Sequence, residues 1–254
     1  MLYRLKDDFK RVSHLYHPRT PNSPMLYAIL DGQFKGQVWV DNPESPTACL
    51  ALSSTPYCFI GGNPSHKVLE MMFKILKAKR HYSIIAPTKS FLNINFKAND
   101  LICEDRLQFR LLNFQEELLT SWIAKLPSDF TLRAIDEEIF EKCMWKNSIT
   151  DYYENKEILF ENGYGACIVH KERVVSEAYA GFVRENGAEM FSITRESYRG
   201  QNLSTIVSSF VIKNIHAKSL QPILSCDTEN IAAIKVATKM GFVEDCTYCF
   251  FTHK

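Results

Sequence analysis

The chain has 254 residues, of which 46% are hydrophobic and 23% are charged. At about 150 residues per domain, this length allows one or two domains, and the composition excludes disordered, collagen-like and low-complexity proteins. Thirty Lys and Arg stand against 29 Asp and Glu, so the net charge of +1 lacks the basic surplus that nucleic-acid binding usually requires. We therefore expect an ordinary globular protein with no nucleic-acid partner.

No segment predicts a membrane span or a leader peptide. No apolar run reaches the roughly 18 to 20 residues that a spanning helix needs, and residues 1–10 mix both charges where a signal peptide needs a continuous apolar stretch. These features favour a cytoplasmic protein without a membrane partner, in which the eight cysteines are reduced and serve mostly as small core residues. Only Cys246 and Cys249 have C-x-x-C spacing, and because no second Cys or His pair follows nearby, we predict no metal site.

The first half of the chain is predicted to form a small α/β unit. Residues 26–31 and 36–40 have the apolar content of strands and flank a glycine-containing turn, which predicts a hairpin. Further strand is predicted at 48–60, and a glycine-rich turn then leads to Ser65, a candidate N-cap for a helix. That turn could bind a phosphate, but no Lys-Ser/Thr pair follows it, which favours a plain connector. The remaining elements predicted in this half are strands at 82–87, 91–96 and 106–112 and a helix at 115–125.

A proline turn at 127–129 is the predicted domain boundary, and it divides the chain into 1–125 and 126–254. Beyond this turn, helical and strand patterns alternate in a compact order. Strands are predicted at 130–135, 165–170, 173–183, 188–194, 222–227 and 242–251, and helices at 137–146, 151–161, 201–217 and 230–240. The sequence shows no internal repeat.

One segment of the second half combines a strand, a polar loop and an amphipathic helix. The strand at 188–194 runs into a loop at 195–202, and the helix that follows keeps apolar residues on one face. The first amides of a helix have no partner within it and carry partial positive charge, so they bind phosphate groups without many cationic side chains. A chain of nearly zero net charge can therefore hold a polyanionic cofactor here.

The same loop carries the motif by which the chain resembles the GNAT superfamily of acetyl-CoA-dependent N-acetyltransferases. The family's pyrophosphate loop has the pattern Arg/Gln-x-x-Gly-x-Gly/Ala, and the matching residues are Arg199, Gly200, Gln201, Asn202, Leu203 and Ser204. Two small positions of the pattern thus carry Asn202 and Ser204. Further along, the run from Asn230 to Gly241-Phe242 is similar to the family's Asn-x-x-Ala/Ser…Gly-Phe helix, in which Asn230 would line the pantetheine arm.

The chain is more narrowly similar to a bacterial GNAT subfamily in which a smaller, variable α/β domain precedes the acetyltransferase domain. The resemblance implies an α/β (α+β) fold whose C-terminal domain has a twisted, mixed sheet flanked by helices and splayed at strand 188–194 to admit acetyl-CoA. The N-terminal domain would shape the acceptor pocket. The residues that the resemblance assigns to acetyl-CoA are Phe191, Ser192, Ile193, Thr194, Arg199, Gly200, Gln201, Asn202, Leu203, Ser204, Thr205 and Asn230.

The resemblance implies direct transfer, in which an acceptor amine attacks the thioester carbonyl while backbone donors of strand 188–194 polarise it. Because an amine is mostly ammonium at neutral pH, a base must accept its proton. Strand alternation places Glu189, Phe191 and Ile193 on one face and Met190, Ser192 and Thr194 on the other. Glu189 is the first candidate base, acting through a water, and Glu177 on the preceding strand is its rival. A purely structural role for Glu189, as a strand cap or in an ion pair, stays open.

Besides Ser204, the residues at positions 237 and 202 depart from the family's pattern. Many members use a Tyr seven residues after the helix-opening Asn to protonate the departing thiolate, and that position is Ala237 here. Either solvent protonates the thiolate or catalysis is absent, since Tyr198 is expected to pack at the loop entrance. Asn202 stands at a glycine position either because a positive φ is needed, which Asn tolerates better than other L-residues, or because a phosphate approaches the backbone closely.

The sequence therefore predicts an enzyme, an N-acetyltransferase that moves an acetyl group from acetyl-CoA to the amine of a small molecule, with a homodimer left open. Cys167 and Cys226 lie in predicted strands without a His at motif spacing, so a thiol nucleophile is not expected. Two alternatives remain. One is a non-catalytic acyl-CoA-binding regulatory module, and the other is a transferase that uses a longer acyl donor.

Overall fold

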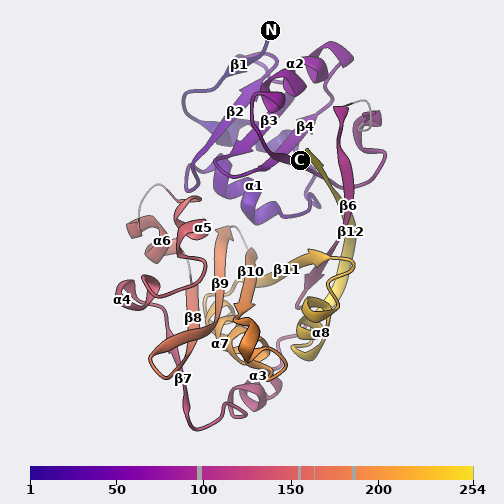
Figure 1. The fold of residues 1–254 in the computed structure, drawn as a ribbon. Helices are drawn as coiled ribbons and strands as arrows, with labels where there is room; N and C mark the ends of the chain where they lie inside the picture. The colour runs from indigo at the N-terminus through magenta and orange to yellow at the C-terminus, as the bar shows by residue number, and fades with distance from the viewer. Residues whose placement is uncertain (96–98, 154–155, 163, 185–186, 254) are drawn as a thin grey trace. The chain divides into compact units, whose positions relative to one another are not determined.

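The structure is a computed structural model that describes residues 1–95, 99–153, 156–162, 164–184 and 187–253 (Figure 1). The chain forms two compact units. The N-terminal unit comprises Met1–Leu107, Asp151–Glu154 and Cys246–Lys254, and the C-terminal unit comprises Gln108–Thr150 and Asn155–Asp245. These units do not coincide with a division at residue 125, because the C-terminal unit already begins at Gln108 and the last residues of the chain belong to the N-terminal unit.

The N-terminal unit holds the elements of the first half of the chain. In order they are β1 (Tyr3–Arg4), the 3-10 helix η1 (Phe9–Leu15), α1 (Ser23–Leu30), β2 (Gly36–Val40), β3 (Ala48–Ser53), β4 (Tyr57–Gly62), α2 (His66–Lys77), β5 (Tyr82–Ala86), the 3-10 helix η2 (Phe91–Asn93) and β6 (Ile102–Arg110). Its core gathers buried side chains of β3, β4 and β5 against Met72, Phe73 and Leu76 of α2. Ser65 caps α2 by accepting a hydrogen bond from the amide of Val68, as predicted.

The prediction of a strand at 26–31, as the first strand of a hairpin, is wrong. Residues 26–31 lie mostly in the helix α1, whereas the strand at 36–40 is confirmed as β2. Six of the eight residues of α1 are buried. A short, wholly apolar run has no period that separates a buried helix from a buried strand, which explains the error. The strand predicted at 91–96 is likewise wrong at its start, where the chain forms η2.

The C-terminal unit confirms most elements predicted for the second half. Its elements are α3 (Glu116–Ile123), β7 (Phe130–Ala134), α4 (Glu137–Phe140), α5 (Lys146–Thr150), α6 (Lys156–Asn162), β8 (Tyr164–His170), β9 (Arg173–Arg184), β10 (Gly187–Thr194), the 3-10 helix η4 (Glu196–Tyr198), α7 (Leu203–Ala217), β11 (Gln221–Asp227) and α8 (Ile231–Lys239). The last strand, β12 (Val243–His253), starts in this unit, and its residues from Cys246 on belong to the N-terminal unit. The helix predicted at 137–146 is instead the single turn α4, and α5 begins only where that prediction ends.

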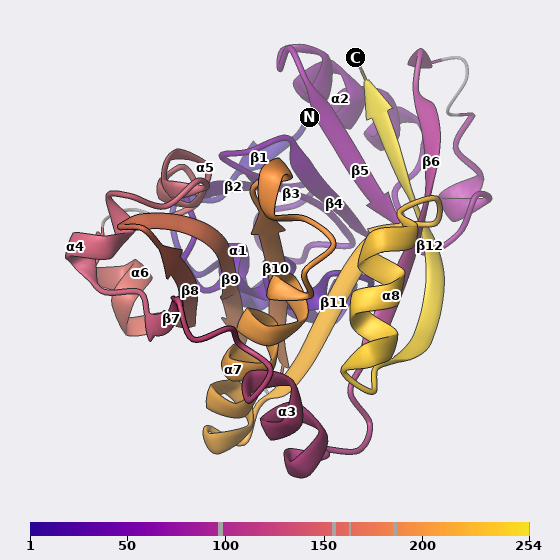
Figure 2. The same ribbon diagram turned by 60° about the horizontal axis from the view of Figure 1, so that its bottom comes forward.

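The two units repeat one order of elements, so the absence of a repeat in the sequence does not hold for the topology. Apart from α3, which comes first in the C-terminal unit, each unit has a strand and helical segments, then three antiparallel strands, and then a helix before a strand that pairs in parallel with the third. In the first unit these last two strands are β4 and β5, and in the second they are β10 and β11. The end of β12 pairs with β5 in the N-terminal unit, as Figure 2 shows.

Helix α7 covers one face of the C-terminal sheet (Figure 1). Every second residue in this part of β9 has a small side chain that is 0% exposed: Ser176, Ala178 and Ala180. Small side chains at these positions let a helix pack closely on the sheet, with Ile206 and Val207 of α7 in the core. Among the described residues, no helix is long and apolar enough to cross a membrane.

Candidate active site

Strand β10 lies between β9 and β11 and separates from β11 halfway along its length (Figure 2). It pairs with β9 to its end at Thr194, but its pairing with β11 runs only from Gly187 opposite Gln221 to Met190 opposite Leu224. The register between β9 and β10 also shifts between Glu189 and Met190. The expected splay of the sheet at this strand is therefore confirmed, and residues 191–194 border it.

The pairing with β9 also fixes which peptide groups of β10 face the splay. The amide of Arg195 donates to the carbonyl of Val175 at 2.9 Å, in register with Thr194 opposite Ser176. Hydrogen-bonded and non-bonded pairs alternate along an antiparallel ladder. We infer that the N–H and C=O of Ser192 and Thr194 point away from β9, toward the side that β11 has left. The Nε of Arg199 donates to the carbonyl of Thr194 at 3.4 Å, in agreement with this direction.

The loop that follows β10 turns through two residues with positive φ. Gly200 has φ +81° and Asn202 has φ +60°, while the first helical bond of α7 runs from the amide of Ile206 to the carbonyl of Asn202. Asn202 therefore has the positive φ that the first of the two predicted alternatives requires. No atom lies within 4 Å of the position that a Cβ on Gly200 would take.

Helix α7 begins with side chains that turn inward. Leu203 is 1% exposed and Thr205 is 0% exposed, so these two residues offer a ligand their backbone rather than their side chains. Ser204 instead bonds to strand β10, with its Oγ 2.7 Å from the Oγ of Ser192. The first turn of α7 is thus fixed to the strand that borders the splay.

A lysine that sequence reasoning missed lies at this loop. The Nζ of Lys239, in the last turn of α8, donates to Oδ1 of Asn202 at 2.6 Å. The carbonyl of Lys239 accepts from Nε1 of Trp122 in α3 at 3.0 Å, which holds the end of α8. No spacing in the sequence relates these three residues, because each comes from a different helix or loop. The structure thereby adds a cation to a loop that the motif describes with Arg199 alone.

Phe191 points to the sheet face opposite α7, as the predicted alternation requires. Its ring stacks on Tyr179 of β9 with a centroid distance of 5.6 Å, and it lies 5.1 Å from the ring of Trp145. The rings of Phe191 and Tyr179 border an apolar pocket with room for ≈ 20 Å³, about the space of one water molecule. The pocket is completed by residues of α4, α5, α6 and β8: Phe140, Ile149, Leu159, Phe160, Tyr164 and Gly165.

The two candidate bases differ in their surroundings. Glu189 is 6% exposed and lies opposite Phe182 of β9 and Ile223 of β11, just before the splay. Glu177 is 0% exposed, and its two carboxylate oxygens accept the amides of Met144 at 2.7 Å and Trp145 at 2.8 Å. Burial raises the pKa of Glu177, and these two hydrogen bonds act against that rise. Glu177 therefore fastens the segment before α5 to the sheet.

Asn230 and Ala237 lie on α8. The side-chain oxygen of Asn230 accepts the amide of Ala233 at 3.1 Å and so caps the helix. Ala237 is 0% exposed, packed within the core. The capping bond gives Asn230 a structural role beside the cofactor contact that the resemblance implies.

Tyr198 does more than pack at the loop entrance. Its hydroxyl lies 3.0 Å from Nδ1 of His170, and the other ring nitrogen of His170 lies 3.1 Å from Oδ2 of Asp129. Phe130 stacks on the imidazole at a centroid distance of 4.3 Å. This chain of side chains links the loop to the end of β8, and nothing in the sequence pattern indicated it.

All eight cysteines are free thiols. Burial raises the pKa of Cys167 to about 12, which makes its thiol a poor nucleophile at neutral pH. Cys249 does not act with Cys246 as a C-x-x-C pair would. Its sulfur instead lies within 4.8 Å of the Sγ of Cys103 and of a carboxylate oxygen of Asp105. The carboxylate of Asp105 also forms an ion pair with Lys89, with 2.7 Å between Oδ2 and Nζ.

Known proteins share this architecture over most of their length. The family model described as GNAT acetyltransferase matches residues 15–251. A curated Bacillus subtilis protein, named uncharacterized N-acetyltransferase YdfB, is 24% identical over 226 residues, which cover 85% of each chain.

Two solved structures extend the comparison. A GCN5-related N-acetyltransferase-like protein from Streptococcus suis has a TM-score of 0.79 and 25% identity, with 96% of this chain and 97% of that chain covered. A tandem GNAT protein from the clavulanic acid biosynthesis pathway has a TM-score of 0.62 and 13% identity, with 100% and 98% covered. The second likeness concerns the fold alone.

Proposed function

Because the chain belongs to the GNAT acetyltransferase family, we propose that it moves an acetyl group from acetyl-CoA to the amine of a small molecule by direct transfer. Family membership supports acyl transfer in general, and the donor and acceptor are our proposal. The observation that carries the proposal is the splay beside β10, where the peptide groups of Ser192 and Thr194 face away from β9 and the following loop leads into α7.

The residues around the splay fit acetyl-CoA. The peptide groups of Ser192 and Thr194 can hydrogen-bond the amide-rich pantetheine arm, as a further strand would. The amides of residues 203–205 have no partner within α7, and Gly200 leaves open space beside the backbone, so a pyrophosphate can approach this helix start. Arg199 and Lys239 add positive charge at the loop.

The pocket beside Phe191 supports an acetyl rather than a longer acyl donor. Its room of ≈ 20 Å³ is about that of one water molecule. Each additional methylene of an acyl chain would have to displace packed aromatic side chains, and overpacking of that kind destabilises a well-packed core.

In the proposed reaction, bound acetyl-CoA supplies a thioester whose carbonyl carbon is the electrophile. Glu189 accepts a proton from the acceptor's ammonium group, and the free amine then attacks. Glu189 is preferred to Glu177 because both oxygens of Glu177 are already bonded to backbone amides. As the C–N bond forms and the C–S bond breaks, the nitrogen loses its second proton to water, and Glu189 later returns its own proton to solvent. Ala237 offers no acid, so the departing thiolate, whose pKa is near that of a free thiol, takes a proton from water.

The test of the function is release of free thiol from acetyl-CoA in the presence of a panel of small amines. We expect thiol release that depends on the amine and on its concentration, with the acetylated amine identified by mass spectrometry. Ala237 in place of the usual Tyr favours a second candidate, a non-catalytic acyl-CoA-binding module. Tight binding of CoA without turnover of any amine would support that second candidate and sink the first.

Substitution of Asn202 tests whether the left-handed backbone conformation at this position affects CoA binding. We expect Asn202→Gly to bind CoA more tightly than Asn202→Ala, by up to about thirtyfold, because a left-handed residue with a Cβ costs roughly 1 to 2 kcal/mol. Both variants lose the bond to Lys239, so their difference isolates the conformational effect. Isothermal titration calorimetry measures the affinities, and equal values for Gly and Ala would contradict the role of φ.

Lys239 provides a test of the charge at the same loop. We expect Lys239→Met to weaken CoA binding about three- to tenfold and to reduce the dependence of affinity on salt, since an exposed ammonium contributes modestly. Lys235→Met is the control, because it removes the same charge from the exposed face of the same helix. An equal loss of affinity in both variants would mean that only the overall charge matters.

We also propose that the protein acts in the cytoplasm, where its eight free thiols stay reduced. A homodimer remains a prediction. Light scattering of the purified protein, which measures its molar mass in solution, tests it.

A further inference from the structure

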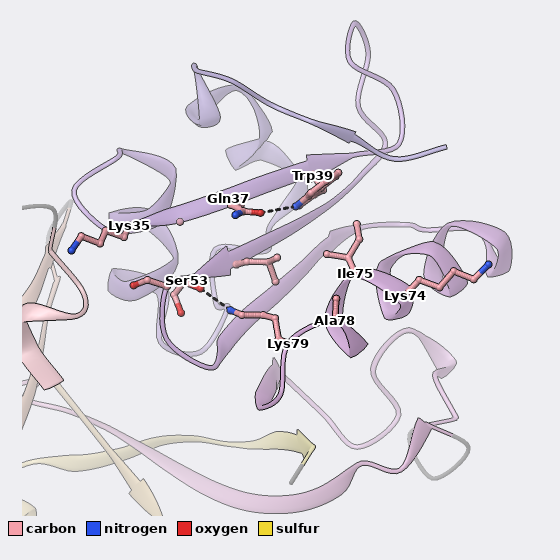
Figure 3. A pocket seen from close by; sticks show the side chains of 11 residues that line it. Lys35, Gln37, Trp39, Ser53, Lys74, Ile75, Ala78 and Lys79 are labelled. Carbon is pink, nitrogen blue, oxygen red and sulfur yellow. Dashed lines mark hydrogen bonds between the residues drawn. The ribbon is translucent and has the colours of Figure 1, made fainter.

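The N-terminal unit contains a large pocket that takes no part in the proposed reaction (Figure 3). Its volume is ≈ 850 Å³, within the range of sites that hold small organic molecules. Strand β2, the end of β3 and the C-terminal half of α2 supply its lining, so the pocket lies between this helix and the strands that it covers.

Three lysines give the pocket its charge. Lys35, Lys74 and Lys79 line it, and no Asp or Glu is among the lining residues. Figure 3 shows Lys35 and Lys74 toward opposite ends, with Lys79 between them. The Nζ of Lys79 donates to the carbonyls of Ser53 at 2.9 Å and Thr55 at 3.0 Å, so two of its three donors hold it in place and a third is left for a ligand.

Beside the polar residues Gln37, Ser53 and Ser54, the lining has an apolar part that includes an aromatic ring. Trp39 lines the pocket, and its Nε1 donates to Oε1 of Gln37 at 3.3 Å, so the polar edge of the indole already has a partner in the same strand. Leu52, Ile75 and Ala78 add aliphatic surface. An aromatic body can therefore pack against Trp39 and Ile75 while an acidic group meets a lysine.

We propose that this pocket binds a small aromatic organic acid, with its carboxylate at Lys79 and its ring against Trp39 and Ile75. Three lysines with no Asp or Glu among the lining residues disfavour cationic ligands and select an anion. Because Lys79 is only partly exposed, its attraction to a carboxylate exceeds what a fully exposed ion pair contributes. The site is separate from the residues assigned to acetyl transfer, and its occupation can be measured without any turnover.

The experiment compares 1-naphthylacetate with its neutral amide, 1-naphthylacetamide, by isothermal titration calorimetry on the full chain. The two probes share one ring system and differ in charge. We expect the acid to bind at least about tenfold more tightly than the amide, as for a charged hydrogen bond, and its affinity to fall as salt is added. Equal affinities, or no binding of either probe, would overturn the proposal.

Matched variants locate the binding. The variant Lys79→Gln removes the charge that meets the carboxylate, whereas Lys77→Gln removes one from the exposed face of α2 outside the lining. We expect the first to weaken binding of the acid about tenfold and the second to change it less than twofold. Thermal melting checks that both variants fold. Equal losses in the two variants, or none in the first, would refute the assignment to this pocket.

Discussion

Replacement of Glu189 by Gln is expected to lower kcat/KM about 100-fold or more at neutral pH while it leaves CoA affinity nearly unchanged. General bases typically contribute 10² to 10⁴ in rate. The amide keeps the shape of the side chain but cannot accept a proton from the ammonium group. Because a free amine needs no base, the defect should shrink as the pH approaches the pKa of the acceptor. Paired pH–rate profiles of the two proteins, with CoA affinities from calorimetry, measure both effects.

Glu196→Gln is the control for this prediction. Glu196 is an exposed residue of η4 in the loop after β10, so its replacement removes the same charge from the same region. We expect its profile to follow that of the parent protein. If Glu189→Gln also follows the parent profile, Glu189 has a structural role and the base must be sought elsewhere, with Glu177 as the next candidate.

Loss of Glu177 is expected to act mainly on stability. Glu177→Ala leaves two amides, those of Met144 and Trp145, without their acceptors next to a side chain that is 0% exposed. An unsatisfied buried donor costs roughly 1 to 3 kcal/mol, so we expect the free energy of unfolding to fall by about 2 to 4 kcal/mol. Urea denaturation followed by circular dichroism measures it, with Glu161→Ala on the exposed face of α6 as the control. A loss no larger than that of the control would show that the tether is dispensable.

The pH dependence of the same site has a defined sign. Burial raises the pKa of Glu177 in the folded protein above that of the unfolded chain. The folded state therefore holds the proton more tightly, and the stability that the group contributes is full below the unfolded pKa of about 4.3 and declines as the pH rises through the folded value. Between the unfolded and the folded pKa of Glu177, the free energy of unfolding of the parent protein should fall as the pH rises, relative to that of Glu177→Gln, in which position 177 does not titrate. A gain of stability over the same interval would contradict the direction of the shift.

The sequence by itself determined the family and the loop. Arg199, Asn202 and the helix after them carry a pattern that depends on local chemistry, because a strand, a left-handed residue and a helix start lie within one continuous stretch. Strong periodicity likewise placed α2 and α7 near their observed positions. Alternation correctly assigned Phe191 and Ser192 to opposite faces of β10.

The tertiary structure decided what depends on residues far apart in the chain. Lys239 meets Asn202 across 37 positions, and Glu177 meets Met144 across 33, so no local pattern could indicate either contact. The same holds for the link from Tyr198 through His170 to Asp129.

The repeated topology was hidden for a related reason. The order of helices and strands in a fold depends on which face of each element is apolar and on where the chain turns. Many different sequences satisfy those conditions. The run at 26–31 looked like a strand because an apolar segment that is buried on all sides has no period, and only packing within the N-terminal unit made it a helix. Sequence thus determined the chemistry of single segments, whereas the pairing of strands and the pocket of three lysines arose only when distant segments were folded together.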